Sequence, residues 1–188
     1  MISTDVYNSI TIWTEWANKE KNQRFDIALF KIWIIFEKFI SELFVNYAIG
    51  GESETGYKPS LKLQFQDETQ LNAFLRGDRT FVDYQGRIKA LSKHIFQNDP
   101  FDLAIFSDGN NYNAYTRIFS IRNYVAHESG EARTKYIKTC LGGNERGYIS
   151  PNDYLKKINT HDGKANYTDL TQAIENMTAI LIDPTPFS

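Results

Sequence analysis

The chain of 188 residues is 41% hydrophobic and 14% aromatic, which is enough apolar material for the core of one domain, and we expect that domain to span residues 1–188. The formal net charge of −2 argues against a protein that binds polyanions over its whole surface, so a nucleic-acid contact would be local. The lone cysteine, Cys140, excludes an intramolecular disulfide and fits a reducing cytoplasm, where we expect the protein to be located.

Sequence motifs of several common chemistries are absent. There is no Gly-rich phosphate loop, no His-Glu-x-x-His and no Gly-x-Ser-x-Gly. His94, His127 and His161 lack metal-ligand spacing, so we expect neither a metal nor another cofactor. No secretory signal peptide is visible, and no uncharged apolar run reaches the roughly 20 residues that a membrane helix needs, so no membrane contact is expected.

Two long helices are predicted at the start of the chain. Residues 3–20 repeat apolar side chains every three to four positions, and residues 25–48 carry one broad apolar face that is rich in aromatic residues. Charged side chains interrupt this second segment, which argues against a membrane span. Asp26 and Glu37 lie at the edge of its apolar face. Either carboxylate could pair with an arginine from another helix, or with an exposed lysine.

The middle of the chain predicts shorter elements. Residues 49–60 have the composition of a loop, and alternation at 61–65 allows a short strand or an extended segment. Short helices are predicted over 67–76 and 84–96. An apolar turn at 102–106 and a polar loop then lead into the next segment.

Residues 112–133 form the stretch around which we expect the chain to be organised. Ala114, Ile118, Ile121 and Val125 fall on one face of a helix. Arg122 projects into the same apolar arc. A guanidinium keeps its proton even when it is buried. Arg122 therefore needs a carboxylate partner in the fold, or it borders a site that uses a fixed positive charge.

His127 follows Arg122 by five residues. We expect Gly130 to stop this helix, which would place His127 in the last turn, where the helix dipole favours a protonated imidazole. Asn123 precedes His127 by four residues, so its amide could orient the ring. An arginine, an orienting amide and a histidine at a helix end are suited to binding an anion or a phosphate.

The last third of the chain predicts two short helices and one longer helix. The short ones cover about 131–141 and 150–158, with a glycine-rich loop at 141–150, and the final amphipathic helix covers 167–182. The fold class is therefore mainly α. We expect an up-and-down helical bundle with several short additional helices and loops.

The segment Arg122-Asn-Tyr-Val-Ala-His127 resembles the R-x(4–6)-H motif of the HEPN superfamily, whose members are small α-helical domains. The resemblance includes the polar Asn123 directly after the arginine. It also includes the long aromatic-rich helix ahead of the motif, with Trp33, Phe36, Glu37, Phe39 and Leu43.

A second match to the spacing runs from Arg87 to His94, and its setting is different. Ile88, which follows the arginine, belongs to an apolar stripe. Arg87 and His94 fit a solvated helix face together with Lys89 and Lys93. The setting, more than the spacing, therefore distinguishes the two matches.

The resemblance implies a metal-independent endoribonuclease of a toxin–antitoxin, abortive-infection or other defence system. In such enzymes the 2′-hydroxyl of the RNA attacks the adjacent phosphate and leaves a 2′,3′-cyclic phosphate. Arg122, Asn123 and His127 would be the catalytic residues. His127 would transfer protons, Arg122 would stabilise the charge of the transition state, and Asn123 would hold the His127 tautomer.

The resemblance also implies partners. Related HEPN proteins dimerise so that the motifs of two protomers face one cleft, which predicts a homodimer with a composite active site. The other expected partners are RNA and a cognate antitoxin. Tyr124, Glu128 and Arg133 are candidate substrate-binding neighbours.

Two alternatives stay open. One is a non-catalytic HEPN-like module that binds a nucleotide, an RNA or a partner protein. The other is an unrelated helical scaffold, in which Arg122 ties helices together and His127 caps a helix end.

Overall fold

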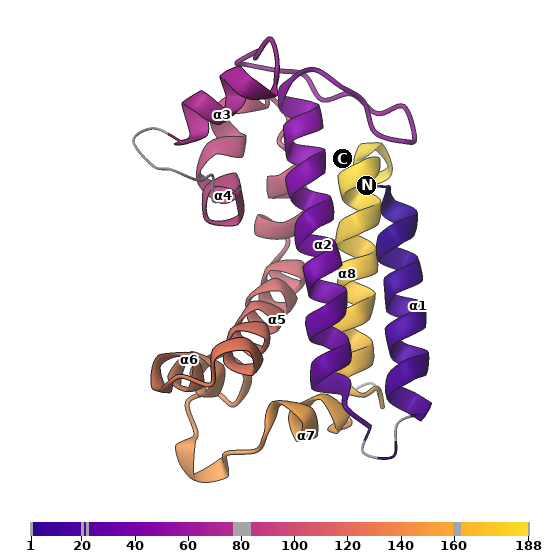
Figure 1. Cartoon of the computed structure of the whole chain (residues 1–188), viewed down its shortest axis with the longest axis vertical. Coiled ribbons are helices and arrows are strands. Elements are labelled where there is room, and N and C mark those ends of the chain that lie inside the picture. Colours follow the sequence, from indigo (N-terminus) through magenta and orange to yellow (C-terminus); the bar gives the residue numbers. More distant parts are fainter. Residues whose placement is uncertain (1, 20, 22, 77–83, 160–162, 188) are drawn as a thin grey trace.

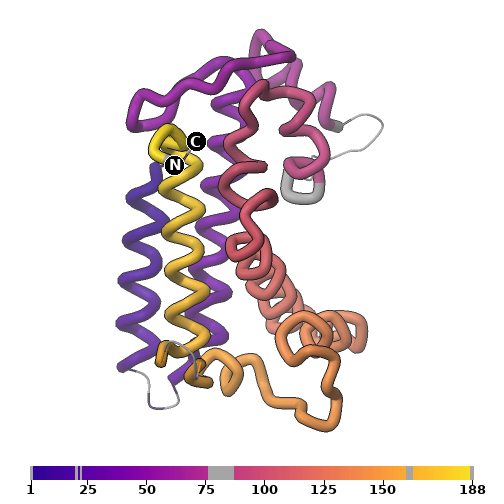
Figure 2. Tube along the Cα trace, turned by 180° about the vertical axis from the view of Figure 1, so that it is seen from behind, coloured from indigo at the N-terminus to yellow at the C-terminus, as the bar shows by residue number. Residues whose placement is uncertain are grey.

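Three long helices stand side by side in the computed structural model, which describes residues 2–19, 21, 23–76, 84–159 and 163–187. They are α1 (Ser3–Lys19), α2 (Phe25–Ala48) and α8 (Asn166–Ile182), and α8 contacts both of the others (Figure 1). Seen from behind, α1 begins and α8 ends at the same end of the bundle (Figure 2). Within the described ranges the chain is mainly helical and has no strand, so the predicted helical bundle is confirmed.

A fourth helix leans away from this upright bundle toward the lower end of the molecule (Figure 1). It is α5 (Gly109–His127), which packs against α2, α8 and α6 (Gly130–Cys140). Below them lies α7 (Pro151–Lys156), which contacts α2 and α8 at the lower end of the bundle. This lower end therefore brings together segments that are far apart in the sequence.

The upper end is built from the middle of the chain. The helices α3 (Glu68–Arg76) and α4 (Tyr84–Ile95) lie beside the upper half of α2 (Figure 1). A π-helical turn, η1 (Asp102–Phe106), leads into α5. Two 3₁₀ turns complete the described structure. The turn η2 (Glu145–Gly147) lies in the loop before α7, and η3 (Thr185–Phe187) follows α8.

The core is centred on the aromatic face of α2. Trp33, Phe36 and Tyr47 are fully buried, and burial of each large apolar side chain stabilises the fold by about 1.5–3 kcal/mol. The Trp33 ring packs edge-on against Tyr115 of α5, with 5.2 Å between the ring centroids. The Tyr47 hydroxyl donates to the carbonyl of Leu181 at 2.8 Å and so ties α2 to α8. The contact between Trp33 and Tyr115 holds α5 against α2.

Side-chain caps set the ends of the helices at the lower end. Asp108 begins α5 by accepting hydrogen bonds from the N–H groups of Asn110 and Asn111. The helix ends at His127 because Glu128 adopts a left-handed backbone with φ of 48°. Ser129 then caps α6, accepting from the Ala132 N–H at 3.2 Å. The prediction of Gly130 as the stop was wrong, although His127 does occupy the last turn.

Of the two alternatives expected for residues 61–65, the structure has the extended segment. The segment 61–65 forms no strand, and its described pairing is a single bridge between Leu61 and Phe96. Leu63 points outward while Phe65 is buried, so the alternation reflects an extended segment that covers the core edge.

Candidate functional site

The Arg122 guanidinium is held between two helices. Its Nη2 donates to Glu37 Oε2 of α2 at 3.4 Å, and its Nη1 donates to the amide oxygen of Asn123 at 2.9 Å. The other carboxylate oxygen of Glu37 accepts from the Trp33 indole N–H at 2.5 Å. Of the two carboxylates expected from the sequence, Glu37 is therefore the partner of Arg122. The second, Asp26, pairs with Arg24 instead.

This ion pair is largely shielded from solvent. The side chain of Arg122 is 26% exposed and that of Glu37 is 15% exposed. The Nε of Arg122 is enclosed and has no hydrogen-bond partner within the described residues. Because Nε cannot be reached, a ligand would have to bind to the Nη donors that Glu37 and Asn123 leave free. The guanidinium is thus a fixed positive group with a limited outward face.

His127 lies in the last turn of α5 with its side chain exposed. Within the described part of the chain, the imidazole makes no hydrogen bond. The amide oxygen of Asn123 is engaged by Arg122, which leaves the Asn123 NH₂ group as the part that could reach the ring. The structure therefore joins Arg122 to Asn123 directly. An orienting contact from Asn123 to His127 stays a prediction.

A cavity of about 350 Å³ opens beside the C-terminal end of α5 and contains two of the three predicted neighbours, Tyr124 and Glu128. Its other walls come from the start of α2 and from the segment that leads into α7. The lining residues are Arg24, Asp26, Ile27, Tyr124, Val125, Glu128, Tyr148 and Pro151. Arg24, Asp26 and Tyr148 had no motif to identify them, because they come from segments that only the fold brings together.

Tyrosines form the wall of this cavity on the α6 side. The hydroxyls of Tyr124 and Tyr148 are 3.1 Å apart, and the ring of Tyr124 stacks on Tyr136 with 5.5 Å between centroids. The hydrogen bond from Tyr124, together with partial burial, raises the pKa of Tyr148 to about 12, so this hydroxyl stays neutral at physiological pH. Arg133, the third predicted neighbour, lies over the Tyr148 ring at 4.7 Å and pairs with Glu145 at 3.8 Å.

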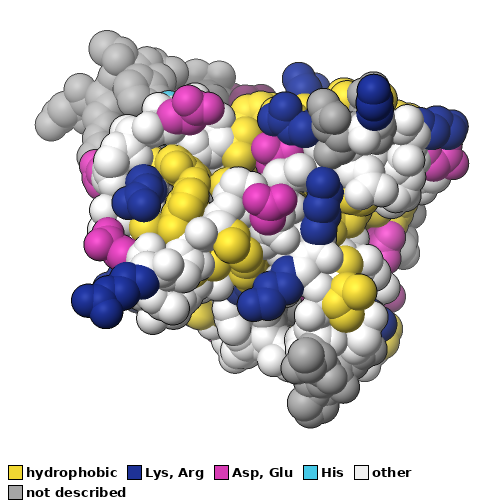
Figure 3. Space-filling view, turned by 90° about the horizontal axis from the view of Figure 1, so that it is seen from below, with side chains coloured by type: hydrophobic (Ala, Val, Ile, Leu, Met, Phe, Trp, Pro, Cys, Tyr) yellow, Lys and Arg dark blue, Asp and Glu magenta, His cyan; other side chains and the backbone are white. Residues whose placement is uncertain are grey.

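The surface charge around this end is mixed. Seen from below, Lys and Arg side chains are dispersed among acidic and hydrophobic side chains on this face (Figure 3). On this face the positive charges are therefore not gathered into one continuous track, in keeping with the net charge of −2.

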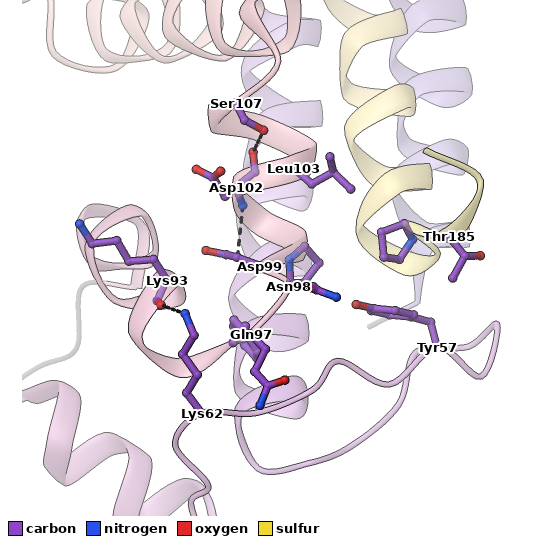
Figure 4. Close-up of a pocket in the computed structure, with 13 residues that line it drawn as sticks. Tyr57, Lys62, Lys93, Gln97, Asn98, Asp99, Asp102, Leu103, Ser107 and Thr185 are labelled. Atoms are coloured by element: carbon purple, nitrogen blue, oxygen red, sulfur yellow. Dashed lines mark hydrogen bonds between the residues drawn. The ribbon is translucent and has the colours of Figure 1, made fainter. Parts of the chain in front are cut away.

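A second cavity, of about 450 Å³, lies at the upper end between the segment before α5 and the C-terminal turn (Figure 4). Its polar groups mostly hold the chain itself. The Lys62 amino group donates to the carbonyl of Lys93 at 2.7 Å, and Asp99 Oδ1 accepts from the N–H groups of Phe101 and Asp102. Burial raises the pKa of the Asp99 carboxyl. We therefore regard the lower cavity as the better candidate site.

Two features of the described residues bear on metal binding and on membrane contact. No group of three or more His, Cys, Asp and Glu side chains lies close enough together there to hold a metal ion. In the same residues, no helix has the length and apolar character needed to cross a membrane. Comparison with family models, with curated proteins and with solved structures found no match to this chain.

Proposed function

We propose that the protein is a metal-independent endoribonuclease of the toxin or defence type. The observation that carries the proposal is the end of α5, where a guanidinium fixed by Glu37 and Asn123 stands five residues before an exposed imidazole. A fixed guanidinium suits the stabilisation of a phosphorane-like transition state, and an exposed imidazole suits proton transfer near neutral pH. The resemblance of this segment to the HEPN motif supports the same chemistry.

The reaction needs two proton transfers. A base removes the proton of the RNA 2′-hydroxyl while that oxygen attacks the adjacent phosphorus. The bond to the 5′-oxygen breaks, and an acid gives that oxygen a proton, which leaves a 2′,3′-cyclic phosphate and a free 5′-hydroxyl. His127 can fill one of these roles, and Arg122 can offset the charge on the phosphoryl oxygens. The second proton-transfer group comes from a second protomer.

The surface near the ion pair favours a homodimer. Ile34 lies three residues before Glu37 on α2, and Phe119 lies three residues before Arg122 on α5. These side chains are 39% and 37% exposed. Residues three apart on a helix share a face, so both apolar side chains lie one turn along the helix from a member of the pair. A second copy that covered them would bury this face of α2 and α5, and in the proposed dimer its His127 completes the composite site.

A second candidate function is a non-catalytic module that binds a nucleotide, an RNA or a protein such as a cognate antitoxin. The observation that favours it is that Glu37 already neutralises Arg122 and ties α2 to α5. In this role the cavity beside Tyr124 and Glu128 would bind the ligand, and His127 would have no chemical task.

The test compares wild-type protein with His127→Ala and with the matched control His94→Ala. Each is incubated with total RNA in the presence of EDTA, and the cleaved ends are analysed for cyclic phosphate. We expect wild type and His94→Ala to cleave and His127→Ala to lose about 10²–10⁴-fold in rate. Equal cleavage, or equal inactivity, of wild type and His127→Ala would contradict the catalytic proposal and favour the binding module.

The composite site has its own measurement. Light scattering at micromolar concentration should give the mass of two chains. A monomeric mass under these conditions would count against a cleft shared by two protomers.

A further inference from the structure

We propose that the cavity between the start of α2 and the end of α5 is a guanine-binding subsite, and this inference rests on the ribonuclease function proposed above. Four side chains carry it: Arg24, Tyr124, Glu128 and Tyr148. The volume of about 350 Å³ lies in the range of small-molecule pockets and is large enough for a nucleobase. The subsite would select the nucleotide beside the cleaved bond.

One residue that lines the cavity is a direct neighbour in sequence of the proposed catalytic histidine. Glu128 lines the cavity and directly follows His127, so their Cα atoms are about 3.8 Å apart. His127 does not itself line the cavity, so the proposal places the base inside the cavity and the ribose and phosphate outside it, on the side of His127. No other described cavity is lined by a direct sequence neighbour of His127 or Arg122.

The cavity offers both an acceptor and donors for hydrogen bonds. Arg24 gives two of its five N–H groups to Asp26, from Nε at 3.0 Å and from Nη2 at 3.2 Å, which leaves three donors without a partner among the described residues. Each carboxylate oxygen of Asp26 already accepts one N–H group of Arg24. The Glu128 side chain is exposed and makes no hydrogen bond or ion pair within the described chain, so it is the carboxylate that remains available.

Guanine matches this combination better than the other bases. Its Watson–Crick edge presents N1–H and N2–H₂ donors, which a carboxylate can accept together. Its O6 and N7 are acceptors, which an arginine can contact with two N–H groups. Adenine would place the lone pair of N1 against Glu128. Uracil and cytosine lack the second ring, and therefore N7.

The tyrosines add a surface on which a base can stack. The hydrogen bond between the hydroxyls of Tyr124 and Tyr148 fixes both rings at the cavity wall. Tyr148 is 37% exposed, and the Arg133 guanidinium lies 4.7 Å from the centre of its ring. Aromatic side chains of this kind stabilise a bound base by about 1–3 kcal/mol in single-strand binding proteins.

Two residues with a left-handed backbone conformation lie in or next to the wall of this cavity. Among the described residues, Gln23 and Glu128 are the non-glycine residues with positive φ, at 47° and 48°. Gln23 directly precedes Arg24, and Glu128 lines the cavity. Left-handed backbone at a non-glycine residue is unfavourable, and such residues occur preferentially at binding and catalytic sites. Here one of them directly precedes Arg24 and the other is Glu128 itself, the two residues that supply the guanidinium and the carboxylate to the cavity.

The test titrates 5′-GMP, AMP, CMP and UMP into the full-length His127→Ala variant by calorimetry. Because the four nucleotides share a phosphate and ribose, differences in affinity report the base. We expect GMP to bind at least about tenfold more tightly than AMP. Glu128→Gln in the same background should reduce that preference to below about threefold. The matched control Glu131→Gln, an exposed carboxylate paired with Lys135, should leave it unchanged.

Each result decides something. Equal affinities for the four nucleotides, or no binding at millimolar concentration, would overturn the guanine subsite, and RNA cleavage by wild type would then still stand. A GMP preference that Glu128→Gln removes would support the subsite even if wild type and His127→Ala were equally inactive on RNA, a result that removes only the nuclease. An unchanged preference in Glu128→Gln would refute the assigned role of that carboxylate.

Discussion

The chain contains two arginine–histidine pairs of similar spacing at opposite ends of the molecule, and they differ in what holds the arginine. At the lower end, Arg122 of α5 binds a carboxylate from another helix, Glu37. At the upper end, Arg87 of α4 donates from Nη1 to the backbone carbonyl of Leu75, near the end of α3. Arg122 forms an ion pair with a side chain, whereas Arg87 donates a hydrogen bond to a backbone carbonyl near a helix end.

The surroundings of the two pairs differ as well. Around the upper pair, Ile88 is buried and His94, Lys89 and Lys93 are exposed, which confirms the expectation of a solvated face for those side chains. Arg87 itself is only partly exposed, which differs from that expectation. The last carbonyls of a helix lack partners within it, so an arginine from a neighbouring helix is drawn to them.

The two arginine–histidine pairs have similar spacing but different surroundings. Both arginines are five to seven residues ahead of an exposed histidine in the last turn of a helix. Of the two, Arg122 is the one held by a side-chain carboxylate and by the amide of the next residue, and its helix lines the lower cavity through Tyr124 and Val125. If function follows from this setting, equivalent substitutions at the two sites should have very different effects.

The largest effect is expected for Arg122→Lys compared with Arg87→Lys. A lysine keeps the charge but loses the planar fork that can contact Glu37, Asn123 and a phosphate together. We expect RNA cleavage to slow by about 10²-fold in Arg122→Lys and to change by less than about twofold in Arg87→Lys. Single-turnover rates measure this, with circular dichroism as the check on folding. A similar loss in both variants would show that the difference in setting has no functional meaning.

Most of the fold could be predicted from the sequence, because long amphipathic repeats leave little choice. The stripe of Ala114, Ile118 and Ile121 is buried as expected, and Val125 is half-buried beside it. Helix ends were harder to predict. The left-handed residue at the end of α5 is Glu128, and a glutamate gives no sequence signal for that conformation.

The candidate site could be predicted only for the residues that lie close together in the sequence. Arg122, Asn123 and His127 share one helix, so their spacing was informative. The choice between Glu37 and Asp26 as partner depends on how α2 packs against α5, which one sequence does not fix. The cavity joins Arg24, Tyr124 and Tyr148 from three segments, and no local pattern links them.

A smaller effect is expected on stability when the lower ion pair is broken. Glu37→Gln keeps the volume of the side chain but leaves the partly buried guanidinium of Arg122 without its counter-charge. We expect unfolding free energy to fall by about 1–3 kcal/mol, because the pair is shielded and Glu37 also accepts from Trp33. Urea denaturation at pH 7 measures the loss. Arg87→Gln, which removes a helix-end contact, should cost no more than about 1 kcal/mol, and a larger loss there would reverse the comparison.

The smallest effect, and one of opposite sign, is expected at the upper end. Asp99 is a carboxylate with no ion pair in the described chain, and burial raises its pKa. A raised pKa means that the folded state binds the proton more tightly than the unfolded state, so stability decreases as pH rises from the ordinary value of 3.8 through the raised pKa.

Asp99→Asn removes the charge and keeps the oxygen that accepts from Phe101 and Asp102. It should therefore stabilise the protein at pH 7, by less than about 1 kcal/mol, and the gain should disappear below the ordinary pKa. Urea denaturation at pH 7 and at pH 3.5 tests both parts. If Asp99→Asn were destabilising at pH 7, the hydrogen bonds that the carboxylate accepts would outweigh the cost of burying its charge. Replacing the carboxylate by an amide would then lower the unfolding free energy at Asp99 as well as at Glu37.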